Sequence, residues 1–596
     1  MTLEIDVEGH QQGYGGLADP VMTELLRYEV LAASEEMLVT MRRTARSVLA
    51  REGADYGAAI LDSRGEIVAQ VVPYGFMYFQ RAVPEIISKY GGQLYDGDVV
   101  VTNDPYGGAS HLPDIVMVRP FYFDNALVGY TAVAQHHTDI GGRFPGGSGA
   151  ASVSVFEEGL RLPAVKLYEQ GKPVAPLLAV IEANVRAPDD VLGDLSAALA
   201  SCIRGADSMT ELLAKYGRNR IDSYFRYITH TSETFMRGLI SSFPDGRHQS
   251  VVHFTDADVE ADIAVSIKVS GDEMTVDLAG TSAQLNLAMN VPFGMTAAMP
   301  VHAMLGFLGE VQGVNLNSGL MRPITVVAPE GSAANPTFPA AVGSRAQLYN
   351  RMVHAARECL AQFAPDVMPA PGEGCNGAIY VSPASDAKQQ FRLLTEFYAS
   401  GWGARPSKDG VDGVMAMMLS GFRTVSSEVA ESETAVALDG FGFVRDTGGA
   451  GKYRGSLAVY RRWRFLDHAR VLVRDTLPGA VHAGRNGGHA SSPSRLTVIS
   501  AGAETVIEPR VLHDLRLAPG DVLEYALASG AGYGSPLERD TAKVLADVID
   551  DKVSPEAARA IYGVALVIDA GGTFCVDHAE TSRLRETMVR SGEDRS

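Results

Sequence analysis

The sequence predicts a multi-domain protein of mixed α/β structure (class α+β), with a helical N-terminal half and a glycine-rich C-terminal part dominated by antiparallel β-strands. The chain has 596 residues, which is more than a single hydrophobic core usually covers. Helical periodicity recurs in the first half, whereas short apolar segments between glycine turns fill the last third. Hydrophobic residues make up 46% and charged residues 20%, which is typical of a folded globular chain.

Turn signals and changes in residue composition and hydrophobic periodicity divide the chain into four predicted parts. An N-terminal domain covers residues 1–243 and ends before Pro244-Asp245-Gly246, a strong turn signal. A central α+β region follows at 244–372, and a glycine-rich, β-dominated domain follows at 373–565. Residues 566–596 form a C-terminal tail.

The elements of the N-terminal domain follow from hydrophobic spacing. Residues 21–50 carry apolar side chains at helical spacing with charges between them, which predicts an amphipathic helix, broken at most once. A hairpin is expected around the turn Asp62-Ser63-Arg64-Gly65. Two apolar runs, 115–120 and 127–134, are too short for helices and predict strands joined by a turn at Asp124-Asn125. A long helix is predicted over 188–216.

The later parts alternate between the two periodicities. Residues 259–269 and 274–278 predict strands, whereas 296–307 and 345–363 predict helices. The string from Ile568 to Thr573 resembles the phosphate loop of sugar-kinase-like ATPases. Too few residues follow it to build the domain that such a loop opens, so a hairpin turn is predicted there.

Composition excludes several classes of function. The net charge is −20, and an acidic surface repels phosphate backbones, so no nucleic-acid partner is expected. The chain has no run of about eighteen apolar residues and no basic-then-apolar N-terminal signal. We therefore expect no membrane partner and a cytoplasmic location. The cysteines show no CxxC spacing, which gives no support to a zinc ribbon or a disulfide scaffold; they are Cys202, Cys359, Cys375 and Cys575.

Chemistry-bearing residues concentrate in the stretch 101–149. The predicted hairpin has one polar cluster before its first strand and another after its second strand, so both clusters should meet at the same end. The first cluster supplies His111 and Asp114, and the second supplies His136. Two imidazoles and a carboxylate suit Zn²⁺, Mn²⁺ or Fe²⁺, with an open position for a water or a carbonyl. Asp55, from the preceding hairpin, is a candidate further ligand.

Two neighbours of His136 are candidates for a catalytic role. Adjacent residues on a strand point to opposite faces, so only one of His136 and His137 should face the site. The other would support the ligands or transfer protons, and Asp139 is a candidate for the same task. The alternative is that all these loop residues bond backbone groups at a glycine-rich turn.

A set of collinear motifs carries a family resemblance. The motifs are NDPYGGASHLPDI (103–115), HHTDIGG (136–142), NVRAPDDVLGDL (184–195), NSGLMRP (317–323), APEGS (328–332), GWGAR (401–405), DTGGAGKYRG (446–455), GYGSPLERD (532–540) and SPEAARAIYGV (554–564). In these motifs the chain resembles the hydantoinase B/oxoprolinase family over about residues 20 to 585.

The resemblance implies a metal-binding B-type subunit. In the family the metal ligands fall at the positions of His111, Asp114 and His136, with Asp55 matched more loosely. The metal would be Zn or Mn, with Fe as a further candidate. B-type subunits pair with a hydantoinase A-type subunit that binds ATP and phosphorylates the substrate, in a heterotetramer or a larger complex. The ATP site would therefore lie in another chain.

Three functions remain open. The leading hypothesis is an ATP-dependent hydrolase of a cyclic amide, such as a hydantoin, a lactam or a 5-oxoproline-like ring, with His137 and Asp139 as catalytic residues. The runner-up is a ketone carboxylase of the acetone or acetophenone type that uses bicarbonate. Two segments that differ from the family pattern, Phe422–Glu428 and Gly479–Gly488, favour this second hypothesis modestly. The third is a non-catalytic scaffold for the A-type subunit.

Overall fold

The computed structural model describes residues 19–591, except residues 148, 150, 257–258, 309–314, 373–376, 385–391, 400, 416–420, 476–480, 509 and 570. Cys375 and the first two residues of the Gly479–Gly488 segment lie outside the described residues. The chain forms two compact units. Unit 1 comprises residues 1–363 with two short later segments, 388–395 and 418–423, and unit 2 comprises the rest. The finer division into four parts stays a prediction.

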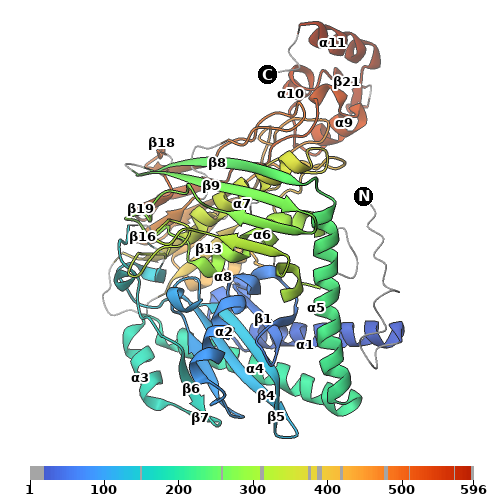
Figure 1. The fold of residues 1–596 in the computed structure, drawn as a ribbon. Coiled ribbons are helices and arrows are strands. Elements are labelled where there is room, and N and C mark those ends of the chain that lie inside the picture. Colours follow the sequence, from blue (N-terminus) through green and yellow to red (C-terminus); the bar gives the residue numbers. More distant parts are fainter. Residues whose placement is uncertain are drawn as a thin grey trace. The chain divides into compact units, whose positions relative to one another are not determined.

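Unit 1 is built on a seven-stranded antiparallel sheet with the strand order β2-β1-β5-β4-β3-β6-β7 (Figure 1). Its strands are β1 (Tyr56–Asp62), β2 (Ile67–Gln70), β3 (Val99–Thr102), β4 (Asp114–Phe123), β5 (Ala126–His136), β6 (Val165–Glu169) and β7 (Lys172–Pro173). The β4–β5 hairpin turns at Asp124 and Asn125, which both have positive φ, 50° and 61°. Two-residue hairpin turns favour this conformation. The predicted strands and their turn are therefore confirmed.

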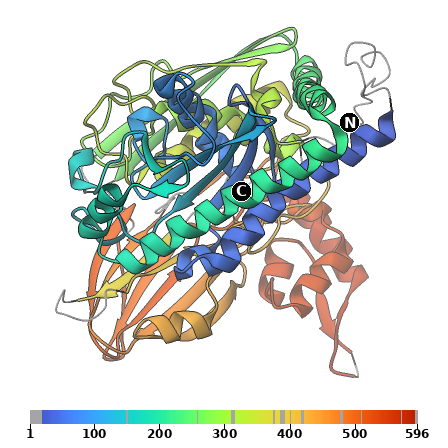
Figure 2. The ribbon, with the colours of Figure 1, turned by 90° about the horizontal axis from the view of Figure 1, so that it is seen from below.

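Two long helices cover one face of this sheet. α1 (Pro20–Thr44) begins where the Asp19 side chain accepts a hydrogen bond from an amide of the first turn. α4 (Pro188–Tyr216) runs beside α1, as the blue and the blue-green helix of Figure 2 show. Gly205 of α4 allows the close approach, because a Cβ there would lie 2.4 Å from Met37 Sδ of α1.

The predicted helix over 21–50 is broken once. The backbone is extended at Ala45, and the chain resumes as a π-helical turn, η2. The other helical elements of this part are η2 (Leu49–Gly53), η3 (Pro73–Met77), α2 (Phe79–Tyr90), η4 (Pro105–Gly107), η5 (Pro145–Gly147), η6 (Val155–Glu157), α3 (Ala175–Asn184) and α5 (Arg218–Ser241).

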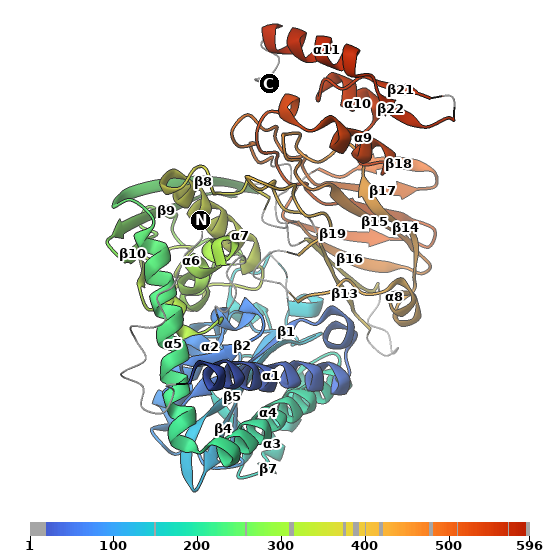
Figure 3. The ribbon, with the colours of Figure 1, turned by 90° about the vertical axis from the view of Figure 1, so that its right-hand side faces the viewer.

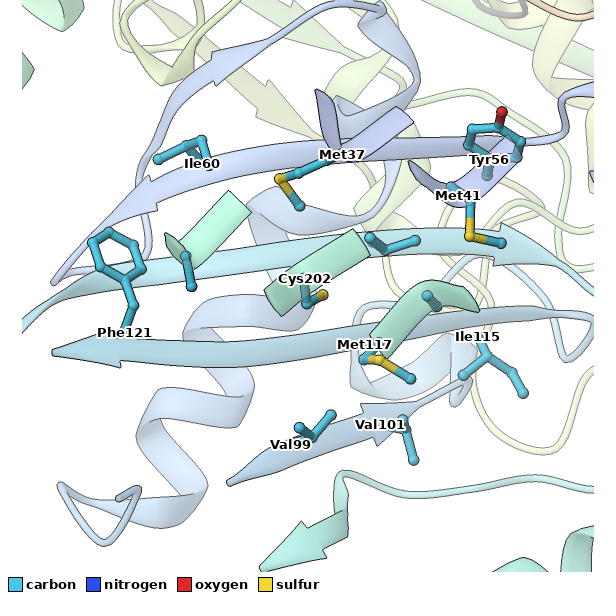
Figure 4. Close-up of a cluster of buried hydrophobic side chains, with 14 of the residues drawn as sticks. Met37, Met41, Tyr56, Ile60, Val99, Val101, Ile115, Met117, Phe121 and Cys202 are labelled. Carbon is cyan, nitrogen blue, oxygen red and sulfur yellow. The ribbon is translucent and has the colours of Figure 1, made fainter. Parts of the chain in front are cut away.

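The hydrophobic core of unit 1 lies between the seven-stranded sheet and the helices α1 and α4. Figure 4 shows Met37 of α1 and Cys202 of α4 among Ile60, Met117 and Phe121 of the sheet. Full burial of one such aliphatic or aromatic side chain stabilises the fold by about 1.5–3 kcal/mol. Because this packed layer covers one face of the seven-stranded sheet, a functional site on the sheet has to lie at the opposite face or at an edge.

The side chains of β5 show that His136 lies on the face of the sheet that α1 and α4 do not cover. Thr131 faces α4, because its hydroxyl donates to the carbonyl oxygen of Cys202 at 3.0 Å. Side chains alternate along a strand, so His136, five residues further, faces the opposite side of the sheet. The segment η3 lies on that side, since the Tyr74 ring lies over Gly57 of β1.

Unit 1 also contains a four-stranded sheet with the order β11-β10-β9-β8. Its strands are β8 (Gly246–Asp256), β9 (Val259–Ser270), β10 (Glu273–Asp277) and β11 (Ile324–Val327). The helix α7 (Arg345–Phe363) packs on β8 and β9, and α6 (Phe293–Leu308) packs on α7 (Figure 1). The short helix η7 (Ser318–Met321) packs on α5, which passes beside both sheets (Figure 3). These elements confirm the predicted strands and helices of the central region.

Unit 2 is dominated by two antiparallel sheets, with the orders β13-β12-β16-β19 and β14-β15-β20-β17-β18. The strands are β12 (Gly377–Pro383), β13 (Leu394–Tyr398), β14 (Val436–Val444), β15 (Ala458–Phe465), β16 (Ala469–Arg474), β17 (Arg495–Ser500), β18 (Ala503–Val506), β19 (Leu512–Leu517) and β20 (Val522–Ala526). The first two residues of β13 are grouped with unit 1. Its helices are α8 (Ser427–Glu433), η9 (Pro536–Glu538), α9 (Thr541–Ile549), α10 (Pro555–Ala560) and α11 (His578–Ser591). The predicted mixed α/β class with a β-dominated C-terminal part is confirmed.

The glycine loops of unit 2 pack backbone against backbone. A Cβ on Gly449 would lie 2.5 Å from the Gly532 nitrogen, and a Cβ on Gly488 would lie 2.2 Å from the Gly532 oxygen. Side chains have no room there, which explains the glycine-rich texture. The segment after Ile568 is a hairpin between β21 (Leu566–Ile568) and β22 (Phe574–Val576), as predicted. Among the described helices, none has the length and apolar character needed to cross a bilayer.

Candidate metal centre

The β4–β5 hairpin brings the two polar clusters of the sequence together. Asp114 is the first residue of β4, His136 is the last residue of β5, and the two are paired in the register. His111 precedes β4 by a tight turn, in which the Asp114 amide donates to the His111 carbonyl oxygen at 3.0 Å. All three side chains are buried, and their ligand atoms lie within 4.8 Å of one another.

A β-bulge decides which histidine meets Asp114. Tyr122 pairs with Leu127, but Phe121 pairs with Gly129, so one extra residue, Val128, enters β5. Without that shift Gln135 would lie opposite Asp114, and His137, two residues further along, would share the face of Asp114. A one-residue shift exchanges the two faces of a strand. The bulge therefore puts His136 rather than His137 on the face of Asp114, an alternative that the sequence left open.

The separations between the donor atoms fit a shared cation. His111 Nε2 lies 3.1 Å from His136 Nδ1 and 3.1 Å from Asp114 Oδ2. His136 Nδ1 lies 2.9 Å from Asp114 Oδ1. Donor atoms held about 2.1 Å from a tetrahedral ion stand roughly 3.4 Å apart. Imidazole nitrogens and a carboxylate are ligands that Zn²⁺, Mn²⁺ and Fe²⁺ accept, so the residues present fit a divalent metal.

His111 is arranged as a neutral ligand. Its Nδ1 lies 3.1 Å from the carbonyl oxygen of Gly343. A carbonyl oxygen can only accept, so Nδ1 carries the proton and the Nε2 lone pair faces the cluster. Burial and the Arg345 guanidinium lower the pKa of His111 to about 3, and the imidazole is therefore uncharged at neutral pH.

Asp114 is arranged as an ionised ligand. Its Oδ2 accepts hydrogen bonds from the Tyr78 hydroxyl at 2.8 Å, from Arg345 Nη2 at 2.6 Å and from the Ser110 hydroxyl. Burial opposes ionisation, but the positive charge of Arg345 outweighs it, so the pKa of Asp114 lies well below its usual range.

Asp55 borders this group of three. Its Oδ1 accepts a hydrogen bond from the Tyr74 hydroxyl at 2.8 Å, and its Oδ2 lies 3.9 Å from His136 Nδ1. The Asp55 carbonyl oxygen also accepts from the His136 amide at 3.0 Å. Burial raises the pKa of Asp55 to about 6, with His136 opposing the rise. Its role as a further ligand stays a prediction.

The two candidate catalytic residues lie just beyond β5. The backbone amide of His137 donates to the Pro113 carbonyl oxygen at 2.8 Å. Among the described residues, nothing hydrogen-bonds to its Nδ1, and burial lowers the pKa of His137 to about 3. His137 is thus a neutral imidazole beside the cluster, and its catalytic role stays a prediction.

Asp139 organises the glycine-rich loop. Its Oδ1 accepts from the amides of Gly141 and Arg186 at 2.8 and 2.9 Å. Its Oδ2 accepts from the Gly146 amide at 3.1 Å and from Arg186 Nη1 at 3.0 Å. Four donors on one carboxylate describe a loop-holding group, as the backbone-bonding alternative expected, and proton transfer by Asp139 stays a prediction.

Four residues that contact the carboxylates were not among the candidates from the sequence: Tyr74, Tyr78, Ser110 and Arg345. Tyr74 and Tyr78 lie in and just after η3, and no motif marks them. Arg345 begins α7 and is 231 residues away from Asp114 along the chain. No local pattern could connect positions so far apart.

Glu158 supports the loop that orients His111. Its Oε1 accepts from the amides of Val342 and Gly343 at 2.9 and 2.6 Å, and the Gly343 carbonyl in turn meets His111 Nδ1. Burial raises the pKa of Glu158 from 4.5 to about 8. The folded chain therefore holds this carboxyl in its neutral form at neutral pH.

This shift predicts a pH-dependent stability. Because the folded pKa is the higher one, the stabilising contribution is complete below about pH 4.5 and is lost as the pH rises through about 8. Glu158→Gln keeps the acceptor and cannot ionise, so this variant should lose less melting temperature than the wild type between about pH 6 and about pH 9. Thermal unfolding at the two pH values measures the difference. Equal losses in both proteins would contradict the prediction.

Comparisons with known proteins place these features in a family context. A family model described as hydantoinase B/oxoprolinase matches residues 19–536. The chain is 28% identical over 593 residues to the B component of a putative D-/L-hydantoinase from Pseudomonas sp. (strain NS671), covering 95% of this chain and 98% of that protein. It is 25% identical over 621 aligned positions to the delta chain of acetophenone carboxylase from Aromatoleum aromaticum, covering 95% of this chain and 89% of that protein.

A solved structure shares the fold. The crystal structure of the ATP-dependent caprolactamase from Pseudomonas jessenii superposes with a TM-score of 0.86 at 27% identity. The match covers 96% of this chain and 100% of that chain. The mixed α/β, multi-domain architecture is therefore that of a known group of proteins.

Proposed function

Because the chain belongs to the hydantoinase B/oxoprolinase family, we propose that it is the metal-binding B-type subunit of a heteromeric, ATP-dependent cyclic-amide hydrolase. The substrate is a hydantoin, a lactam or a 5-oxoproline-like ring. ATP is bound by an A-type partner, which phosphorylates the amide oxygen, and the present chain completes the ring opening. Relatives named as part of a hydantoinase and as an ATP-dependent caprolactamase support the proposal.

The main support for the proposal is that the buried side chains of His111, Asp114 and His136 converge on one point. A divalent cation held by these three residues would polarise the carbon under attack or activate a water molecule. The chain prepares the site in three ways. The Gly343 carbonyl keeps the His111 Nε2 lone pair directed at the cluster, Arg345 keeps Asp114 ionised, and burial keeps bulk water away from both.

The neighbouring residues have supporting roles in this proposal. In this proposal His137, a neutral imidazole next to His136 in the chain, accepts a proton from the reacting group. Asp139 holds the glycine-rich loop through its bonds to Gly141, Gly146 and Arg186. The complete enzyme is a heterotetramer or a larger complex with the A-type subunit.

The test is a reconstituted assay. The full chain and an A-type subunit are combined with ATP, a divalent metal and a panel of hydantoins, lactams and 5-oxoproline. Ring opening that requires both proteins and ATP is the expected result. If none of the cyclic amides is turned over, the proposed hydrolase function is contradicted.

A ketone carboxylase is the second candidate. The similarity to one chain of an acetophenone carboxylase over 95% of this chain supports it, and the same cluster would then serve a bicarbonate-dependent step on an activated ketone. Labelled bicarbonate incorporated into acetone or an aryl ketone, with no ring opening, would select this function over the hydrolase.

A further inference from the structure

We propose that Tyr74 and Tyr78 are positioning residues, each of which occupies one oxygen of one carboxylate so that the other oxygen is left for the metal. The inference rests on the proposed metal site at His111, Asp114 and His136, and it takes Asp55 as the further ligand of that site. It explains how Asp55 and Asp114 would each bind the metal through a single carboxylate oxygen.

The two tyrosines come from one short segment. Tyr74 lies in η3, and Tyr78 follows it at the start of α2. Their ring centroids are 4.6 Å apart, and both side chains are buried. A buried phenol needs a hydrogen-bond partner, and here each hydroxyl has a different carboxylate as its acceptor.

The oxygens of both carboxylates are divided in the same way. The Tyr78 hydroxyl donates to Asp114 Oδ2, the oxygen that lies 3.1 Å from His111 Nε2 and that two further donors also occupy. Asp114 Oδ1, which lies 2.9 Å from His136 Nδ1, is the oxygen that this proposal leaves for the metal. The Tyr74 hydroxyl donates to Asp55 Oδ1, and Oδ2 is the oxygen that faces His136 Nδ1 at 3.9 Å. Each tyrosine therefore holds the oxygen that does not face the imidazole of His136.

The segment that carries the tyrosines is braced on two sides. Gly57 of β1 accommodates the Tyr74 ring, since a Cβ there would lie 2.8 Å from Tyr74 Cδ1. On the other side, His302 Nε2 donates to the Pro73 carbonyl oxygen at 3.3 Å, and the Tyr349 hydroxyl donates to His302 Nδ1. Such packing limits the freedom of both hydroxyls, which a positioning role requires.

The two tyrosines should differ in importance. Tyr78 is one of three donors to Asp114 Oδ2, with Arg345 and Ser110. Within the described part of the chain, Tyr74 is the one side chain that donates to Asp55. Removing the Tyr74 hydroxyl leaves Asp55 free to turn, whereas Asp114 keeps two donors after Tyr78 loses its hydroxyl.

The experiment measures Co²⁺ affinity of the purified full chain by competition with a chelator. Tyr74→Phe should weaken binding by about 10–100-fold, the usual effect of removing a partner of a ligand. Tyr78→Phe should weaken it less than Tyr74→Phe. Tyr224→Phe is the matched control, because Tyr224 is also buried in unit 1 but belongs to α5, and its affinity should equal that of the wild type.

A double-mutant cycle separates positioning from general stability. If Tyr74 acts through Asp55, Tyr74→Phe should have no further effect on Co²⁺ affinity in an Asp55→Ala background. Gly57→Ala, which displaces the Tyr74 ring without removing its hydroxyl, should reproduce the loss seen for Tyr74→Phe. Circular dichroism of each variant checks that the chain is folded.

Three results would overturn the inference while leaving the metal site standing: unchanged affinity in Tyr74→Phe, unchanged affinity in Asp55→Ala, or a Tyr74→Phe effect that is equally large with and without Asp55. A wild-type chain that binds no Co²⁺ would instead overturn the metal site and the proposed function with it.

Discussion

His111→Ala is expected to abolish metal binding by the purified chain and to lower turnover by the reconstituted enzyme on the order of 10³-fold or more, since a bound metal contributes several kcal/mol to such reactions. The physical reason is local. His111 Nε2 is 3.1 Å from both His136 Nδ1 and Asp114 Oδ2, and its loss removes one of three converging donors. Elemental analysis and the ring-opening assay measure the two effects.

A second buried histidine provides the control. His482 of unit 2 is also buried, and His482→Ala removes the same side-chain volume without removing any of the proposed ligands, so metal content should remain at the wild-type level. Circular dichroism checks that both variants are folded. A His111→Ala complex with full activity would show that the chain acts as a scaffold for its partner rather than as the site of chemistry.

Arg539→Met is expected to destabilise unit 2 by about 3–5 kcal/mol, the usual cost of removing one partner from a buried ion pair. The Arg539 side chain is 1% exposed and donates to both oxygens of Asp409 at 2.7 and 2.9 Å. It also donates to Asp547 of α9 at 2.7 Å. The substitution leaves the Asp547 carboxylate, which is 9% exposed, and the Asp409 carboxylate, which is 30% exposed, without this cation, which explains the size of the effect.

The measurement is hydrogen exchange of α9 together with the melting temperature of the whole chain. Arg495→Met is the matched control, because the Arg495–Glu504 pair is 57% and 56% exposed, and solvent-exposed pairs contribute about 0–1 kcal/mol. Equal losses in the two variants would show that the Arg539 pairs do not stabilise unit 2 more than a surface pair does.

Much of the site could be predicted because it depends on local chain geometry. The turn at Asp124-Asn125 joins two short apolar runs, and any hairpin built on it must return the second polar cluster to the level of the first. His111, Asp114 and His136 therefore converge as expected. The collinear motifs likewise identified the family that the chain belongs to.

The remaining features depend on contacts between distant segments. Arg345 reaches Asp114 only because the first residue of α7 lies beside the first residue of β4 in the folded chain, and a sequence pattern does not report such proximity. Tyr74 and Tyr78 look like ordinary core aromatics in the sequence, and their hydroxyls acquire a role only from the carboxylates opposite them. Asp139, expected to move protons, was found with four donors that hold its loop.

By itself, the sequence determined many of the elements, the mixed α/β class, the glycine-rich character of unit 2 and the two polar clusters that supply the candidate metal ligands, since these depend on composition and on spacing along the chain. Only the tertiary structure decided between His136 and His137. The extra residue at Val128 shifts the pairing by one position, and a shift of one exchanges the two faces of a strand. Packing between remote segments also set the pKa values of His111 and Asp114, because burial and Arg345 act on them through space rather than along the chain.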